Sequence, residues 1–114
     1  NFIKDQDMRI RARAAVSLYK YNQDRAFGLF WEMAHNPDSE VRLSAMEAVE
    51  KIEHPRTAML LLKLTSDPDQ RVKQQVFNAI GRLLEKPSEW LPNDIKERMV
   101  QVVNKIKIAE GWIG

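Results

Sequence analysis

Two stretches of this sequence are near copies of each other. Residues 36–52 read NPDSEVRLSAMEAVEKI, and residues 67–83 read DPDQRVKQQVFNAIGRL. A weaker third copy, DQDMRIRARAAVSLYKY, occupies residues 5–21. The step between copies is 31 residues, which separates Asp7 from Asp38 and Asp38 from Asp69. Internal periods of this length are typical of stacked supersecondary units that cannot bury their apolar faces alone.

Residue type also repeats at this step in the stretches that separate the copies. Leu29 matches Leu60, and Met33 matches Leu64. Inside the copies, the sets of positions that match in type are Ile10, Val41 and Val72; Arg11, Arg42 and Lys73; Ala14, Ala45 and Val76; and Leu18, Val49 and Ile80. So many matches at one spacing indicate a true repeat.

Each copy has the pattern of an amphipathic helix. Within residues 38–53, apolar side chains recur at three- and four-residue spacings, which places them on one helix face. Asp38 and Asp69 stand where an N-cap residue is expected, because a carboxylate there accepts a bond from otherwise unpaired backbone amides. Pro37 and Pro68 come one residue earlier and discourage any helix from running through. The copies therefore predict helices that begin just after Asp38 and Asp69.

A second helix is predicted before each of the last two copies. Residues 24–35 (DRAFGLFWEMAH) and 55–66 (PRTAMLLLKLTS) are apolar on nearly all sides, as expected of helices wedged between neighbours. Pro55 suits a first helical turn, and no sustained period-two alternation predicts a strand. We expect an all-α fold, a right-handed α-solenoid (α-α superhelix) of antiparallel helix pairs, with about six helices and a period of 31 residues.

The expected organisation is a single repeat domain over residues 1–114. It comprises the second helix of a truncated repeat at about 7–21, a repeat at about 24–53, another at about 55–85, and an irregular C-terminal capping helix at about 94–109. Phe2 and Ile3 would then be the tail of a preceding helix, so we expect the chain to be a fragment of a longer protein. Trp90 and Trp112 are predicted to cover the C-terminal end of the stack.

Composition places few limits on function. The net charge is only +2, and it alternates along the chain, being +3 over residues 1–26, −4 over 27–69 and +3 over 70–114. This alternation argues against a continuous stripe that tracks phosphates. Cysteine is absent, which excludes a disulfide framework and thiolate chemistry. The longest apolar run, residues 58–62, is too short to cross a bilayer, and we expect a cytoplasmic protein.

The second and third copies resemble the second helix of HEAT-like repeats, and the nearest kind is the short form found in phycobilisome-lyase-type proteins. The family pattern has an Asp in the inter-helix turn and a Val-Arg pair in the second helix. Asp5, Asn36 and Asp67 hold the turn position, and the pair appears as Ile10-Arg11, Val41-Arg42 and Val72-Lys73. The resemblance covers residues 5–85 and implies a polar ladder between repeats, from which Asn36 and Lys73 each depart.

The second helix of the repeat at about 24–53 turns by about 100° per residue. Leu43 and Glu50 therefore point nearly opposite the apolar core stripe of that helix. The resemblance implies that this side lines a concave surface. The partner-binding candidates on and beside it are Met8, Arg9, Ala12, Arg13, Val16, Tyr19, Leu43, Met46, Glu50, Gln74 and Phe77. Such a strip suits an apolar or helical peptide, because methionine adapts its shape. Arg9 and Arg13 would receive acidic side chains; the alternatives are that Met46 and Phe77 pack beneath a neighbouring repeat and that both arginines are merely solvated.

No catalytic or metal-binding pattern was found in the sequence. His35 and His54 are the only histidines, each near a predicted helix boundary, where capping or solvent exposure is expected. Glu47 and Lys51 are predicted to pair across one helical turn. We therefore expect no enzyme activity, no cofactor and no metal. The predicted function is a scaffold that binds a protein, a peptide or other domains of its parent chain.

Two alternative functions remain open. The first is nucleic-acid binding through the cluster Arg9, Arg11 and Arg13. The second, suggested by the resemblance alone, is a bilin lyase-like or chaperone-like role.

Overall fold

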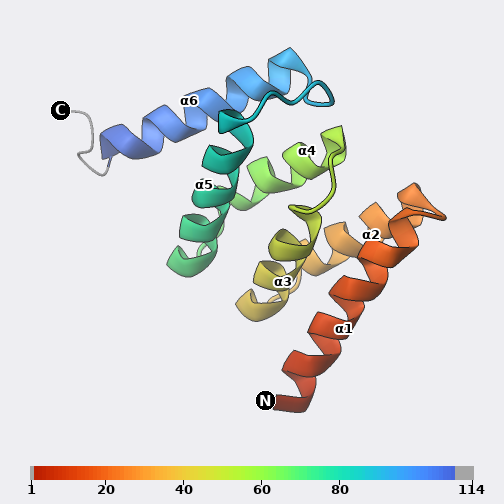
Figure 1. The fold of residues 1–114 in the computed structure, drawn as a ribbon. Coiled ribbons are helices and arrows are strands. Elements are labelled where there is room, and N and C mark those ends of the chain that lie inside the picture. Colours follow the sequence, from red (N-terminus) through yellow and green to blue (C-terminus); the bar gives the residue numbers. More distant parts are fainter. Residues whose placement is uncertain (1, 110–114) are drawn as a thin grey trace. The chain divides into compact units, whose positions relative to one another are not determined.

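The computed structural model describes the backbone of residues 2–109 and the side chains of residues 9–109. Within this range the chain forms six α-helices and no strand (Figure 1). The helices are α1 (Phe2–Tyr19), α2 (Gln23–Ala34), α3 (Ser39–Val49), α4 (Pro55–Leu64), α5 (Gln70–Glu85) and α6 (Asn93–Ala109). The all-α fold and the number of helices predicted from the sequence are confirmed.

The two strongest copies begin their helices in the same way. The Oδ1 atom of Asp38 accepts a hydrogen bond from the backbone amide of Glu40 at 2.9 Å. The Oδ1 atom of Asp69, 31 residues later, accepts one from the amide of Arg71 at 2.8 Å. Each carboxylate satisfies an amide that the first helical turn leaves without a partner. The predicted N-caps of α3 and α5 are confirmed.

The turns in front of these caps are also copies of each other. The amide of Asp38 donates to Oδ1 of Asn36, and the amide of Asp69 donates to Oδ1 of Asp67, both at 2.9 Å. In the first turn, Nη1 of Arg42 also donates to the carbonyl oxygens of Asn36 at 2.8 Å and Pro37 at 2.9 Å. The arginine of the Val-Arg pair therefore secures the turn of its own repeat.

Both histidines lie at helix ends, as the sequence predicts. His54 is the N-cap of α4, where its Nδ1 accepts from the amide of Arg56 at 3.1 Å and Pro55 follows as the first helical residue. His35 is the C-cap of α2, where its Nδ1 donates to the carbonyl oxygen of Trp31 at 2.8 Å. Local capping therefore accounts for the position of each imidazole.

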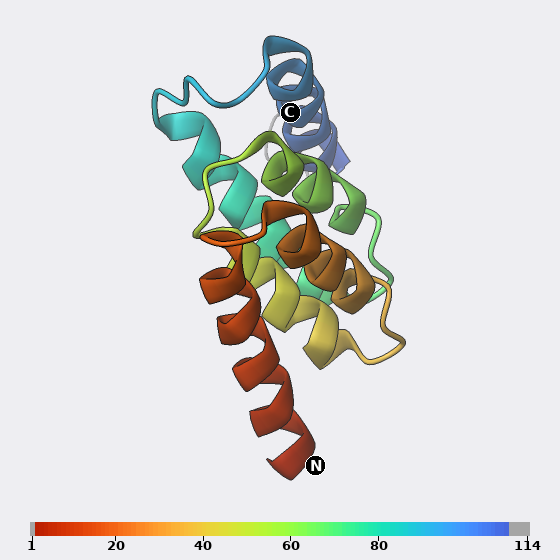
Figure 2. The ribbon, with the colours of Figure 1, turned by 90° about the vertical axis from the view of Figure 1, so that its right-hand side faces the viewer.

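The chain divides into two compact units, Asn1–Ile52 and Glu53–Gly114. In the first unit, α1, α2 and α3 each pack against the other two. The chain reverses direction after α1 and again after α2, so neighbouring helices run roughly antiparallel (Figures 1 and 2). The buried apolar side chains on these helices include Ala15, Ala26, Phe27, Phe30, Val41, Ala45 and Val49. Edge-to-face contacts join Phe27 to Tyr19 and to Phe30.

In the second unit, α5 packs against both α4 and α6, and α4 also contacts α6. The buried side chains on these three helices include Thr57, Ala58, Leu61, Leu64, Val72, Val76, Ile80, Ile95 and Met99. Trp90 lies half-buried in the connection between α5 and α6. The prediction for Trp112 falls outside the described residues.

The start of α1 differs from the expectation. Phe2 and Ile3 form its first turn rather than the tail of a preceding helix, and the helix runs unbroken to Tyr19. The physical reason is the residue at position 6. Gln6 stands one repeat step before Pro37 and two steps before Pro68. Glutamine, unlike proline, lets a helix continue through that position.

Candidate functional site

The predicted partner-binding residues do not gather at one place. Arg9, Ala12, Arg13 and Val16 line one groove of the first unit, and Gln74 and Phe77 line a groove of the second unit. Tyr19, Leu43, Met46 and Glu50 line neither. Met8 belongs to α1, but its side chain lies outside the described residues. The first groove therefore brings together the largest group of predicted residues.

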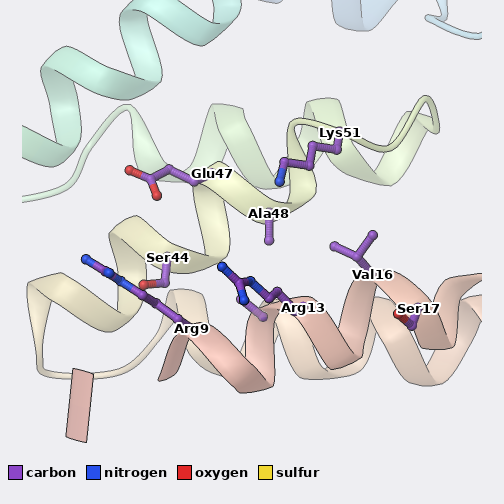
Figure 3. A pocket seen from close by; sticks show the side chains of 9 residues that line it. Arg9, Arg13, Val16, Ser17, Ser44, Glu47, Ala48 and Lys51 are labelled. Atoms are coloured by element: carbon purple, nitrogen blue, oxygen red, sulfur yellow. The ribbon is translucent and has the colours of Figure 1, made fainter. Parts of the chain in front are cut away.

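This first groove, called here the α1–α3 groove, has a volume of about 500 Å³. Its walls come from α1 and from α3 with the turn that follows it (Figure 3). The lining residues are Arg9, Ala12, Arg13, Val16 and Ser17 on one side and Ser44, Glu47, Ala48 and Lys51 on the other. Because both walls belong to helices that pack directly on each other, the groove is a feature of the first unit alone.

Small side chains form the floor of the α1–α3 groove. Ala12 and Ala48 are buried, and Val16 is half-buried. An alanine at the contact between two helices leaves the space that a larger side chain would fill, so the hollow follows directly from these residues. The floor offers room for small or medium apolar groups of a ligand.

Cations surround this floor. Arg9 and Arg13 rise from α1, and Lys51 extends from the turn after α3, whereas Glu47 is the acidic side chain in the lining (Figure 3). Among the described residues, these three cations make no hydrogen bond or ion pair with another side chain. The lining therefore carries an excess of positive charge, which attracts an anionic group.

The groove of the second unit is smaller, at about 230 Å³, and lies beside α5 and α6. Phe77 and Ile106, both half-buried, supply its apolar part, and Gln74 supplies polar groups beside them. Nε2 of Gln74 donates to Oδ1 of Asn78 at 3.3 Å, along the same face of α5. We call this the α5–α6 groove; its other lining residues are Thr65, Gln70, Lys73 and Ala109.

The predicted partner-binding residues that line neither groove are buried or half-buried within the first unit. Met46 is only 1% exposed, so its sulfur and methyl group cannot meet a partner directly; the alternative that it packs internally describes its position. Tyr19 is half-buried and meets Phe27 edge to face, with ring centroids 5.8 Å apart. Leu43 and Glu50 are half-buried on α3 and at its C-cap.

The predicted cluster of three arginines does not form one surface. Arg9 and Arg13 line the α1–α3 groove, whereas Arg11 lines a different groove, together with Leu29 and Glu32. A step of two residues turns a helix by about 200°, so Arg11 must point away from its neighbours. This arrangement weakens the case for nucleic-acid binding through these three residues together.

Five lining residues were absent from the predicted partner-binding set, namely Ser17, Ser44, Glu47, Ala48 and Lys51. Lys51 was expected to pair with Glu47 across a helical turn, but α3 ends at Val49 and the two side chains form no ion pair. The missing signal was the helix end. Once Lys51 leaves the helix, the spacing of four residues no longer brings it beside Glu47.

The part of the chain that the structure describes contains neither a cluster of metal ligands nor a membrane-spanning helix. No three His, Asp or Glu side chains in that part lie close enough together to hold a metal ion. None of the described helices is both long enough and apolar enough to cross a bilayer.

A family model of HEAT repeats matches residues 28–92. The matched stretch is more than half of the chain and contains α3, α4 and α5. It also contains the two turns before α3 and α5, which have the same pattern of hydrogen bonds. No curated protein and no solved structure matches the chain. The family expected from the repeated turn and helix is confirmed, whereas the phycobilisome-lyase subtype stays a prediction.

Proposed function

We propose that this chain, which belongs to the HEAT repeat family, is a non-catalytic protein-binding module that holds its partner in the α1–α3 groove. HEAT repeats commonly serve as protein-interaction scaffolds, because packed helix pairs present extended and rigid surfaces. The observation that carries the proposal is the convergence of Arg9, Arg13 and Lys51 around a floor of small apolar side chains. The proposed compartment is the cytoplasm.

The composition of the groove favours a particular kind of partner. Three cations against one carboxylate suit a segment that carries Asp or Glu side chains, since each arginine can form charge-assisted hydrogen bonds with a carboxylate. The floor of Ala12, Val16 and Ala48 suits an apolar side chain between those acids. The proposed ligand is therefore a short peptide segment that combines acidic and apolar residues. Leu43, Glu50, Gln74 and Phe77 stay predicted secondary contacts.

The proposal can be tested without knowing the natural partner. Random peptides displayed on phage would be selected against the full chain, and the enriched sequences should be rich in Asp and Glu beside apolar residues. Reversing two charges of the groove, Arg9→Glu with Arg13→Glu, should weaken binding of an enriched peptide by about tenfold or more, measured by fluorescence anisotropy.

A matched control changes the same amount of charge elsewhere. Arg98 and Lys105 are exposed on α6 and line neither groove, so the double variant Arg98→Glu with Lys105→Glu should bind like the original chain. Circular dichroism checks that both double variants remain helical. Enriched peptides without acidic residues, or an equal loss of binding in both double variants, would contradict the proposal.

Nucleic-acid binding is the second candidate, because Arg9, Arg13 and Lys51 converge on one hollow. Arg11, the third arginine of the predicted cluster, lines a different groove, so the three arginines do not form one phosphate-binding surface. A duplex DNA oligonucleotide titrated at low and then higher salt distinguishes the two candidates, since phosphate binding weakens steeply with salt. We expect little binding at either salt concentration. The bilin-related role depends on the resemblance alone, and no described contact adds to it.

A further inference from the structure

A second groove of the first unit shares no lining residue with the α1–α3 groove. It has a volume of about 340 Å³ and we call it the α1–α2 groove. Its lining comes from all three helices and consists of Arg11, Ala14, Leu29, Glu32, Met33, Asn36 and Val41. The proposed peptide-binding role uses none of these side chains, so the groove needs an explanation of its own.

The exposed fractions of side chains 31 residues apart show how this groove differs from the matching part of the next repeat. Leu29 is 37% exposed in the groove, whereas Leu60, one step of 31 residues later, is 2% exposed. Ile10, one helical turn before Ala14, is 61% exposed, whereas Val41 at the matching position is 1% exposed. In both comparisons the earlier residue exposes apolar surface that its match 31 residues later buries.

The packing of the following copy shows what kind of element covers such positions. Val41 and Ala45 lie on α3, which is the copy of α1, and α3 packs against α2 within the first unit. A helix placed on α1 as α2 is placed on α3 would cover Ile10 and Ala14. Leu29 lines the same groove as Ala14, so a helix seated there would cover Leu29 as well.

Arg11 supplies an independent indication of how such a helix would lie. Its copy, Arg42, donates to the carbonyl oxygens of Asn36 and Pro37 at 2.8 and 2.9 Å, immediately beyond the end of α2. Arg11 lines the α1–α2 groove and has no such turn in front of it, because α1 is continuous there. A helix that ended beside Arg11 would offer its last carbonyl groups, which lack intrahelical partners.

The charges of the groove are mixed, which separates it from the α1–α3 groove. Arg11 lies on one wall and Glu32 on the other, and both are exposed. Neither a strongly acidic nor a strongly basic partner suits such a pair. An apolar helix face bordered by residues of both signs does, as in the sequence of α2, where Asp24 and Arg25 precede the apolar residues.

We propose that the α1–α2 groove is the docking site for one further amphipathic helix, of the length and character of α2, that belongs to an adjoining helical-repeat partner. The helix runs antiparallel to α1 and ends beside Arg11. Its apolar face contacts Ala14 and Leu29 in the groove and covers Ile10 beside it. The proposal concerns a different surface from the peptide-binding groove and does not depend on it.

The test supplies such a helix to the full chain and asks whether it docks. The probe is a copy of residues 22–36, the α2 helix with its caps, fused ahead of Asn1 through a flexible Gly/Ser linker of about eight residues, which spans about 16 Å on average. Tethering raises the local concentration of the helix, so a weak contact is still measured. The control fusion carries Phe27→Ser and Phe30→Ser in the added copy only.

The intact fusion should unfold at a temperature about 5 °C higher than the control fusion, and the amides of Ile10 and Ala14 should exchange more slowly with solvent. Adding Leu29→Glu to the original α2 of the fused chain should abolish this gain, because a carboxylate would be buried against the docked helix. Val100→Glu should not, since Val100 is exposed on α6, outside the groove. Circular dichroism of Leu29→Glu in the unfused chain confirms that it folds.

Several results would overturn the proposal. Equal unfolding temperatures for the two fusions would show that the groove does not hold a helix of this type. A gain that survives Leu29→Glu would place the added helix elsewhere. A dimer of the unfused chain in sedimentation experiments, dissociated by Leu29→Glu, would make a second copy the occupant instead of a repeat partner.

Discussion

The ring of Tyr19 meets the ring of Phe27 edge to face, with 5.8 Å between centroids and an angle of 89° between planes. This contact joins the last residue of α1 to α2. Edge-to-face pairs of this geometry contribute about 0.5–1.5 kcal/mol beyond the burial of their area. The pair gives Tyr19 a structural role at a position that the sequence assigned to a partner-binding face.

The first prediction follows from that contact. Tyr19→Leu should lower the free energy of unfolding by about 1 kcal/mol, while binding of an acidic peptide to the α1–α3 groove stays unchanged. A double-mutant cycle with Phe27→Leu, followed by urea denaturation, should show a coupling of about 0.5–1.5 kcal/mol. A coupling near zero, together with weaker peptide binding, would return Tyr19 to the partner-binding surface.

The second prediction concerns the matched N-caps. Asp38→Ala and Asp69→Ala should each lower the free energy of unfolding by about 1 kcal/mol, because each removes the acceptor of one backbone amide. Glu97→Ala, on the exposed side of α6, is a control that should change stability by less than about 0.5 kcal/mol. Denaturation followed by circular dichroism measures all three. A cap variant as mild as the control would mean that its hydrogen bond contributes nothing.

The third prediction compares the two turn residues that stand at matching positions. Asp67 is buried and Asn36 only half-buried, although each accepts a bond of the same length. Asp67→Ala should therefore be the more destabilising change, by about 2 kcal/mol against about 1 kcal/mol for Asn36→Ala. Asp67→Asn, which keeps an acceptor oxygen, should recover part of the loss. The reverse order in thermal unfolding would contradict this account.

The fourth prediction concerns the continuity of α1. Gln6→Pro should make α1 begin near residue 6 instead of at Phe2, because proline removes a backbone donor and clashes with the preceding turn. Backbone chemical shifts should then lose helical character over residues 2–5, while residues 9–19 keep it. Gln6→Ala should leave the whole helix intact. If residues 2–5 stay helical in the proline variant, the residue at position 6 does not decide where α1 begins.

Features with local causes were predictable from the sequence. The starts of α3, α4 and α5 depend on a capping side chain and a nearby proline, and these signals are read within a few residues of chain. The start of α1 was predicted wrongly, because the third copy was assumed to contain the turn of the other two. At its position 6, glutamine replaces the proline that accompanies that turn elsewhere.

The grouping of site residues was less predictable, because a groove belongs to two helices at once. Helical periodicity placed Arg9, Arg13 and Val16 on one face of one helix, and the structure shows these side chains lining one groove. It could not tell that Lys51 joins them from a neighbouring turn, nor that Met46 on the same nominal face is buried. Those facts depend on how far one helix turns and shifts against the next.

The hydrogen bonds in the turns before α3 and α5 join residues that lie close together along the chain. The bond from Arg42 to the carbonyl oxygen of Asn36 spans six residues. The residues that stabilise each turn therefore belong to the same segment as the turn itself. Duplication of one segment therefore also duplicates the residues that stabilise its turn. A mutation in one turn needs no compensating mutation in another.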